Sequence, residues 1–145
     1  MEGLILRKLR VEDTKDIVRI QEQITQSKMN QDFNSMIEQE AGKPDSGSFV
    51  AELNGRLIGF MISYILTGSF GMEESAWIAV LGVESQYMGQ GIGKRMAEEI
   101  FRFYREKGIE NIYTSVRWDS TDLLSFFKTL EFDRSNFVNL KKVLN

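Results

Sequence analysis

The sequence predicts one α/β domain built on a mixed, mostly antiparallel sheet flanked by helices. Three features carry this prediction: an Asn-Gly turn at 54–55 between two apolar strands, a continuous apolar run over Ala76–Val83, and a glycine-rich turn, Gly89–Gly93, that opens an amphipathic helix. The apolar run, this helix and the strand that follows form a β-α-β unit, so these two strands should lie parallel. A length of 145 residues fits a single domain over 1–145.

The expected elements are apolar segments at strand or helix spacing, separated by polar or glycine-containing stretches. Because Asn-Gly favours the positive φ angles of a two-residue turn, the strands on either side of it should pair as a hairpin. In order, the elements are a strand near Leu4–Leu9, a helix capped by Asp13 or Thr14, a short helix ending near Gly42, strands Ser48–Leu53, Arg56–Leu66 and Ala76–Val83, a helix from the glycine turn to about Gly108, a strand Ile109–Val116, a helix capped by Ser120 or Thr121, and a final hairpin or pair of short strands within Phe132–Leu144.

The composition excludes several kinds of chemistry. The chain has no Cys and no His, so disulfides, thiolate nucleophiles, Ser-His-Asp triads and His- or Cys-bound metals are excluded, and we expect no metal. A net charge of −3 argues against nucleic-acid binding, which usually needs a basic surface. The sequence shows no stretch of membrane-spanning length and no signal peptide, so we expect a cytoplasmic protein without membrane attachment.

The glycine turn has the features of an anion-binding site. Glycines allow the backbone to approach a ligand closely, and a helix start offers unpaired N–H groups and the positive end of the helix dipole. Lys94 and Arg95 add positive charge in the first turn, where they oppose the dipole unless an anion is bound. A Walker loop does not fit, because Met88 and Arg95 stand where it needs Gly and Ser or Thr. A dinucleotide fingerprint does not fit either, because the third glycine comes one residue early.

The turn instead resembles the signature of the GNAT family, the Gcn5-related N-acetyltransferases, which bind acetyl-CoA. Their loop reads Arg/Gln-x-x-Gly-x-Gly/Ala, usually after Val-x-Pro-x-Tyr, and here Val83, Tyr87 and Gly89–Gly93 match the common extended form. Met88 stands in place of Arg or Gln, and Ser85 in place of Pro. Neither change removes a backbone amide.

The resemblance covers most of the chain. Leu9–Ile17 resembles the family's first strand and helix entry, Leu57–Phe60 resembles its third strand, and Ser120–Phe132 resembles its second motif. The resemblance therefore implies the GNAT fold, with the β-α-β unit as its one parallel pair, in a small single-domain protein of bacterial or archaeal type. It also implies a homodimer as one possible assembly.

The resemblance further implies a mechanism and a set of binding residues. Acetyl-CoA would be the cosubstrate, and a primary amine would attack its thioester directly in a ternary complex. The Leu81 backbone amide would act catalytically by polarising the thioester carbonyl. The residues expected to bind the cosubstrate are Leu81, Gly82, Val83, Met88, Gly89, Gln90, Gly91, Ile92, Gly93, Lys94, Ser120 and Phe127.

The sequence does not decide which groups act as general acid and general base. The family's usual general acid is a Tyr at the position of Phe127, and a phenyl ring cannot donate a proton; Tyr113, Ser115 or water are the alternatives. The fourth strand holds no carboxylate, so Glu84 beside it is the nearest candidate base, acting through water if burial raises its pKa. A solvated surface acid is the other interpretation of Glu84. An amine that is already partly neutral would need no strong base.

Two further functions compete with acetyl transfer. One is an acyl-CoA-binding or interaction module on the same fold, favoured by Phe127 and by the missing carboxylate. The other is a nucleotide-phosphate binder, and the mismatch to the Walker and dinucleotide spacings argues against it. In the family, the first two helices and the loops 42–48 and 67–75 shape the acceptor side, and their mild acidity suits an amine without choosing one. The acidic residues there are Glu38, Glu40, Asp45, Glu73 and Glu74.

Overall fold

The Asn-Gly turn forms the hairpin that the sequence predicts. In the computed structural model, which describes residues 1–68 and 73–145, Asn54 and Gly55 have φ angles of 51° and 85°. Two successive positive φ angles match the right-handed twist of paired strands. The turn joins β2 (Phe49–Leu53) to β3 (Arg56–Leu66), which pair antiparallel.

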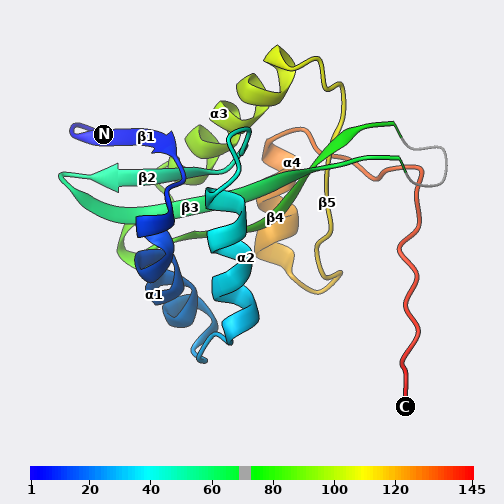
Figure 1. Ribbon diagram of the computed structural model, residues 1–145, viewed down its shortest axis with the longest axis horizontal. Helices are drawn as coiled ribbons and strands as arrows, with labels where there is room; N and C mark the ends of the chain where they lie inside the picture. The colour runs from blue at the N-terminus through cyan, green and yellow to red at the C-terminus, as the bar shows by residue number, and fades with distance from the viewer. Residues whose placement is uncertain (69–72) are drawn as a thin grey trace. The chain divides into compact units, whose positions relative to one another are not determined.

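The sheet is mixed and mostly antiparallel, as predicted (Figure 1). Its order is β1-β2-β3-β4-β5, with β1 at Leu4–Lys8, β4 at Ser75–Val83 and β5 at Ile112–Thr114. The first four strands pair antiparallel, and β4 and β5 form the one parallel pair among the described strands. The β4-α3-β5 unit is therefore confirmed.

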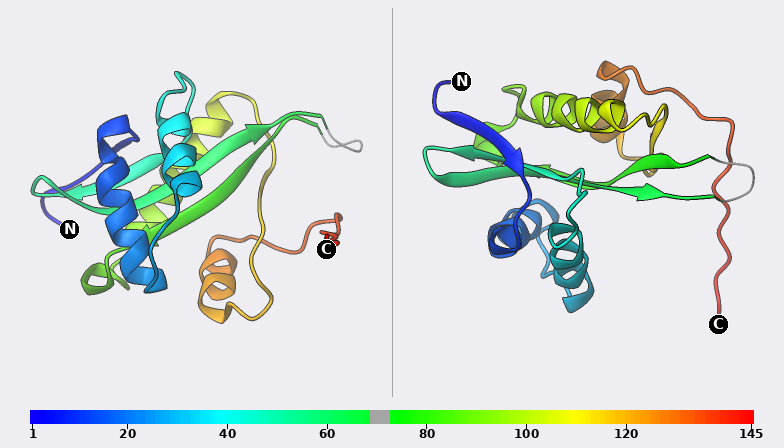
Figure 2. Two further views of the ribbon diagram at one scale, coloured as in Figure 1. Left: turned by 60° about the horizontal axis from the view of Figure 1, so that its bottom comes forward. Right: turned by 45° about the horizontal axis from the view of Figure 1, so that its top comes forward.

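Helices cover both faces of this sheet. The helices are α1 (Thr14–Thr25), α2 (Gln31–Ala41), α3 (Ile92–Glu106) and α4 (Thr121–Thr129), and the short 3₁₀ turns are η1 (Val11–Asp13) and η2 (Ser85–Tyr87). Figure 2 shows α1 and α2 on one face of the sheet and α3 on the other. Ile17, Ile20 and Ile37 pack with Phe60 and Ile62 on the first face, and all five are fully buried.

The entry to α1 differs in detail from the predicted cap. Asp13 holds the N-cap position, but its carboxylate makes no cap hydrogen bond to α1. It accepts instead from the Arg10 N–H at 2.8 Å and from two nitrogens of the Arg7 guanidinium, both at 2.8 Å. Asp13 therefore links the start of α1 to Arg7 of β1.

The chain comprises two compact units, Met1–Thr114 and Ser115–Asn145. The first contains β1 to β5 and α1 to α3, and the second contains α4. The single acetyltransferase domain over 1–145 stays a prediction. No helix in the described part of the chain is both long and apolar enough to cross a bilayer.

One predicted strand is shorter than expected, and the predicted C-terminal hairpin is absent. Strand Ile109–Val116 is reduced to the three residues of β5, because only Ala76–Ile78 of β4 pair with it. The final hairpin within Phe132–Leu144 is absent; the segment has no helix or strand, and Val138 and Leu140 are 83% and 86% exposed. Apolar alternation expresses a tendency toward strand, but a strand also needs a partner, and none of the described strands pairs with this segment.

Candidate active site

A β-bulge in β4 determines which backbone groups face its outer edge. Ile78 pairs with Ser63 and Val80 with Ile62, so Ala79 is an extra residue without a partner on β3. An extra residue shifts the alternation of the strand by one. Before the bulge, the Ala76 N–H donates toward β5, to the Asn111 carbonyl at 3.2 Å. After it, different residues face that edge.

Leu81 and Val83 present their backbone groups to this edge. The Glu84 N–H donates to the Ile58 carbonyl of β3 at 2.8 Å. Because N–H directions alternate along a strand, Gly82 also points its N–H toward β3, whereas Leu81 and Val83 point theirs away. Within residues 1–68 and 73–145, β5 pairs with this outer edge of β4 only as far as Ile78, and no other strand pairs with it, so from Leu81 to Val83 the edge is open to an extended ligand.

The arrangement of Gly82 does not fit the prediction that this residue binds the cosubstrate. Its backbone pairs with Phe60 in β3, and it is buried. A Cβ at this position would lie 2.8 Å from Ile24 Cδ1 and from Phe60 Cε1. The missing side chain makes room for the core under α1, and the backbone groups of Gly82 do not face the open edge.

The glycine turn has the conformation that its sequence indicates. Gly89 and Gly91 have φ angles of 77° and 82°, which L-residues with side chains rarely adopt. A Cβ on either glycine would meet no atom within 4 Å. The need for glycine here is therefore one of backbone conformation, and the space beside the turn is open.

Six consecutive amides of the turn are available to an anion. The first bond into α3 runs from the Arg95 N–H to the Gly91 carbonyl at 3.1 Å. Among the described residues, no acceptor receives the N–H groups of residues 89 to 94. The first turn of α3 holds no acidic residue, and Lys94 and Arg95 are exposed. Helix-start amides, dipole and basic side chains together favour a phosphate.

Met88 departs from the predicted set of amides. Its N–H donates to the Ser85 carbonyl at 3.3 Å within η2. The amide is therefore engaged in the turn that leads into the glycines. The predicted contact from the Met88 amide to a pyrophosphate does not fit this arrangement.

Glu84 is buried and ion-paired, contrary to the interpretation as a solvated surface acid. Only 4% of its side chain is exposed. Its Oε1 accepts a hydrogen bond from Arg19 Nη1 of α1 and another from Arg56 Nη2 of β3 at 2.8 Å. Its Oε2 accepts from Gln86 Nε2 at 3.3 Å.

These partners also decide the protonation state of Glu84. Burial by itself raises the pKa of the carboxyl, but the hydrogen bonds and charges of Arg19 and Arg56 outweigh burial and hold the pKa below its ordinary value. The candidate base required a raised pKa, so this condition is not met. A carboxylate that already accepts from two guanidinium groups is a poor proton acceptor.

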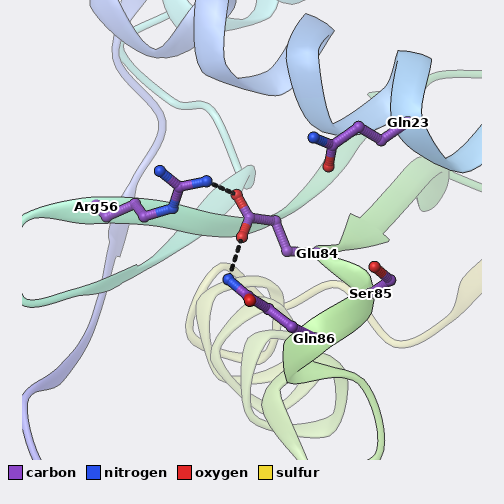
Figure 3. Close-up of a pocket in the computed structure, with 5 residues that line it drawn as sticks. All are labelled: Gln23, Arg56, Glu84, Ser85 and Gln86. Carbon is purple, nitrogen blue, oxygen red and sulfur yellow. Dashed lines mark hydrogen bonds and ion pairs between the residues drawn. The ribbon is translucent and has the colours of Figure 1, made fainter.

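A cavity of about 370 Å³ borders this ion-pair cluster (Figure 3). It is lined by Gln23, Arg56, Glu84, Ser85 and Gln86. Figure 3 shows Arg56 and Gln86 reaching opposite oxygens of the Glu84 carboxylate, with Gln23 above them on α1. The lining is polar, and three of its residues, Glu84, Ser85 and Gln86, precede the glycine turn in the sequence.

The residues predicted in the second unit are described by themselves. Phe127 is buried and packs edge-on against Phe126 and Phe132, with ring centroids 5.2 and 5.0 Å apart. Ser120 holds the N-cap position of α4, one of the two predicted, but its side chain makes no cap hydrogen bond. Their contacts with the cosubstrate stay predictions.

Two of the five acidic residues expected near the acceptor have basic partners. Glu40 pairs with Lys43 at 2.7 Å, and Asp45 pairs with Lys107 at 2.9 Å. Glu73 and Glu74 are exposed. Part of the predicted acceptor loop, residues 69–72, lies outside the described residues.

Sequence reasoning missed Arg19 and Arg56. They lie 65 and 28 residues from Glu84 along the chain, and no local motif connects them. The turn chemistry was readable because its residues are adjacent in sequence. In the described ranges 1–68 and 73–145, no group of three or more acidic side chains is placed to hold a metal ion.

Comparison with known proteins points to one family. Residues 12–132 match the model of the acetyltransferase (GNAT) family. Mycothiol acetyltransferase from Amycolatopsis mediterranei (strain U-32) is 29% identical over 100 residues, which cover 67% of this chain and 33% of that protein. A second mycothiol acetyltransferase, from Arthrobacter sp. (strain FB24), is 23% identical and covered over 32% of its length. The chain thus spans about a third of the length of these curated relatives.

Solved structures agree on the fold. An aminoglycoside acetyltransferase from an uncultured soil metagenomic sample, in complex with sisomicin, has a TM-score of 0.78 at 21% identity, covering 99% of this chain and 97% of that one. Ribosomal-protein-alanine N-acetyltransferase from Brucella melitensis biovar Abortus 2308 has a TM-score of 0.77 at 13% identity, covering 98% and 99%. With the family model matching most of its length, the chain belongs to the GNAT family of acetyltransferases.

Proposed function

We propose that the protein transfers the acetyl group of acetyl-CoA to a primary amine. The observation that carries the proposal is the pairing of two backbone features at one end of β4: the open edge at Leu81 and Val83, and the unengaged amides of the glycine turn. The first suits the amides of an extended pantetheine arm, and the second suits a pyrophosphate. The residues present therefore fit this cosubstrate.

Acetyl-CoA supplies an activated thioester. The chain's own contribution begins with the Leu81 N–H, which faces the open edge and is free to donate to a carbonyl oxygen that gains negative charge during amine attack. A rigid donor of this kind stabilises developing charge without reorganisation. The amides of residues 89–94 hold the phosphates and fix the position of the ligand.

Proton transfer requires little from the side chains in this proposal. Glu84 keeps its charge through Arg19 and Arg56, and Phe127 has no proton to give. A thiolate is a good leaving group and can take a proton from water. The protein therefore acts mainly by orientation and by the Leu81 N–H, and it works best on amines that are partly neutral at the pH of the reaction.

The acceptor is an amine of a class that relatives with this fold use. The similar structures include an aminoglycoside acetyltransferase and a ribosomal-protein-alanine N-acetyltransferase, so amino sugars and peptide N-termini are the first two classes to test. The exposed Glu73 and Glu74 add negative charge that favours a cationic acceptor.

The test is thiol release from acetyl-CoA with a panel of amines. The panel contains sisomicin, an alanine-initiated peptide, a lysine-containing peptide and spermidine, with N-acetylated versions of the first two as matched controls. We expect release that depends on a free amine. Tight acetyl-CoA binding without turnover of any amine would favour the alternative, an acyl-CoA-binding module, for which the phenyl ring at Phe127 is the supporting observation.

A further inference from the structure

The Glu84 ion-pair cluster lies between the core and the phosphate-binding turn. The cluster consists of Glu84, Arg19, Arg56 and Gln86. Glu84 lies between the end of β4 at Val83 and the start of η2 at Ser85, and Gly89 follows four residues after η2 starts. Its backbone makes two further bonds: the N–H donates to Ile58, and the carbonyl accepts from the Tyr87 N–H at 2.9 Å.

The cluster fixes this junction from three directions. Arg19 reaches Glu84 from α1 and also donates through Nη2 to the Leu57 carbonyl at 3.1 Å. Arg56 reaches it from the start of β3, and Gln86 from η2 itself. A buried carboxylate is costly unless it is fully paired, so its retention here needs a reason beyond packing.

We propose that Glu84 is a positioning residue that holds the start of the glycine turn in its ligand-binding conformation. The inference rests on the proposed function, because the ligand it serves is acetyl-CoA. Gly89 and Gly91 give the turn its positive φ angles, and a Cβ on either residue would meet no atom within 4 Å. The turn therefore depends on its two ends for order, and these are α3 on one side and the Glu84 cluster on the other. Loss of the anchor leaves the amides present but less well arranged, which weakens ligand binding.

The test uses Glu84→Gln, which keeps the shape and removes the charge. Arg19 and Arg56 are 31% and 56% exposed at their side chains, so water can solvate them in the variant and the fold should persist. Glu99→Gln is the matched control, because Glu99 makes a similar bond to Arg102 at 2.9 Å on α3, away from the turn. Acetyl-CoA binding is measured by calorimetry, and hydrogen-exchange mass spectrometry follows the backbone amides at 84–88, where Glu84, Tyr87 and Met88 donate hydrogen bonds.

We expect Glu84→Gln to weaken acetyl-CoA binding about tenfold, equivalent to about 1.4 kcal/mol, and to speed amide exchange at 84–88 while exchange in α3 beyond its first turn is unchanged. Glu99→Gln should change neither. With an amine that the native protein acetylates, KM for acetyl-CoA should rise while kcat and the shape of its pH profile stay the same.

Three results would overturn the inference. A Glu84→Gln variant that loses only thermal stability, with native affinity, assigns Glu84 a structural role. A fall in kcat with loss of the rising limb of the pH profile makes it a base. Unchanged exchange at 84–88 shows that Glu84 does not order the start of the turn. A native protein that does not bind acetyl-CoA instead contradicts the proposed function itself, which keeps the two failures apart.

Discussion

Leu81 lies opposite Met61 at a position of the β3–β4 ladder where the two residues exchange no hydrogen bonds. Its N–H therefore points away from β3, to the edge that β5 leaves open after Ile78. Without the bulge at Ala79, the same edge would receive Val80 and Gly82 instead. One extra residue in β4 thus selects the backbone donor that is proposed to act on the thioester.

Replacing Leu81 by proline tests this donor directly. Proline removes the N–H that faces the edge and leaves the ladder to β3 intact, since an outward-facing N–H is where a strand tolerates proline. We expect kcat to fall about a hundredfold or more, with acetyl-CoA affinity reduced far less. Leu81→Ala, which keeps the N–H, is the control and should retain most of the activity. Equal kcat in the two variants would show that the Leu81 amide is not the donor.

Reversing the charge at Lys94 should move stability and binding in opposite directions. Lys94 lies in the first turn of α3, where a positive side chain opposes the helix dipole and an acidic one supports it. We expect Lys94→Glu to raise the free energy of unfolding by about 0.5 kcal/mol and to weaken acetyl-CoA binding about tenfold or more. Thermal unfolding and calorimetry measure the two effects. A variant that is more stable and still binds natively would argue against an anion at this helix start.

Tyr104 should make the fold sensitive to alkaline pH. Its hydroxyl lies 2.7 Å from the Ser63 hydroxyl and is buried. Burial raises its pKa to about 12; the bond to Ser63 opposes this rise, and the negative charge of Glu40 adds to it. Because the unfolded chain ionises first, near pH 10, the folded protein loses stability between pH 10 and 12.

The loss attributable to Tyr104 is about 3 kcal/mol at full titration. Tyr104→Phe should be less stable at neutral pH by about 1 kcal/mol, because the bond to Ser63 is lost. Between pH 10 and 12 its stability should fall less steeply than that of the native protein. Chemical unfolding at each pH gives both slopes, and parallel slopes would contradict the assignment.

How far the sequence predicts the structure depends on the range of each interaction. The hairpin at Asn54-Gly55 and the turn at Gly89 and Gly91 were predictable, because their conformations follow from adjacent residues with positive φ angles. The partners of Glu84 were not, since Arg19 and Arg56 come from other elements far along the chain. The direction in which the pKa of Glu84 shifts depends on those partners, so it could not be predicted from burial alone.

The predictions of the length of β5 and of a C-terminal hairpin were wrong for a related reason. Both predictions relied on apolar alternation, which measures how well a segment fits a sheet and not whether a neighbouring strand is available. Beyond Ile78 the bulge in β4 ends the pairing with β5, and after α4 no described strand pairs with the segment from Phe132 onward. Neither fact is local.

The central claim is that the glycine turn binds the pyrophosphate of acetyl-CoA, and calorimetry with acetyl-CoA on Gly91→Glu tests it most directly. Gly108→Glu is the matched control, because Gly108 has a φ angle of 80° against 82° for Gly91, and a Cβ at either position meets no atom within 4 Å. Both variants carry the same backbone strain and the same added charge, but only Gly91→Glu places them at the start of α3. We expect micromolar or tighter binding by the native protein and by Gly108→Glu, and none by folded Gly91→Glu. Native binding by Gly91→Glu, or no binding by the native protein, would contradict the assignment.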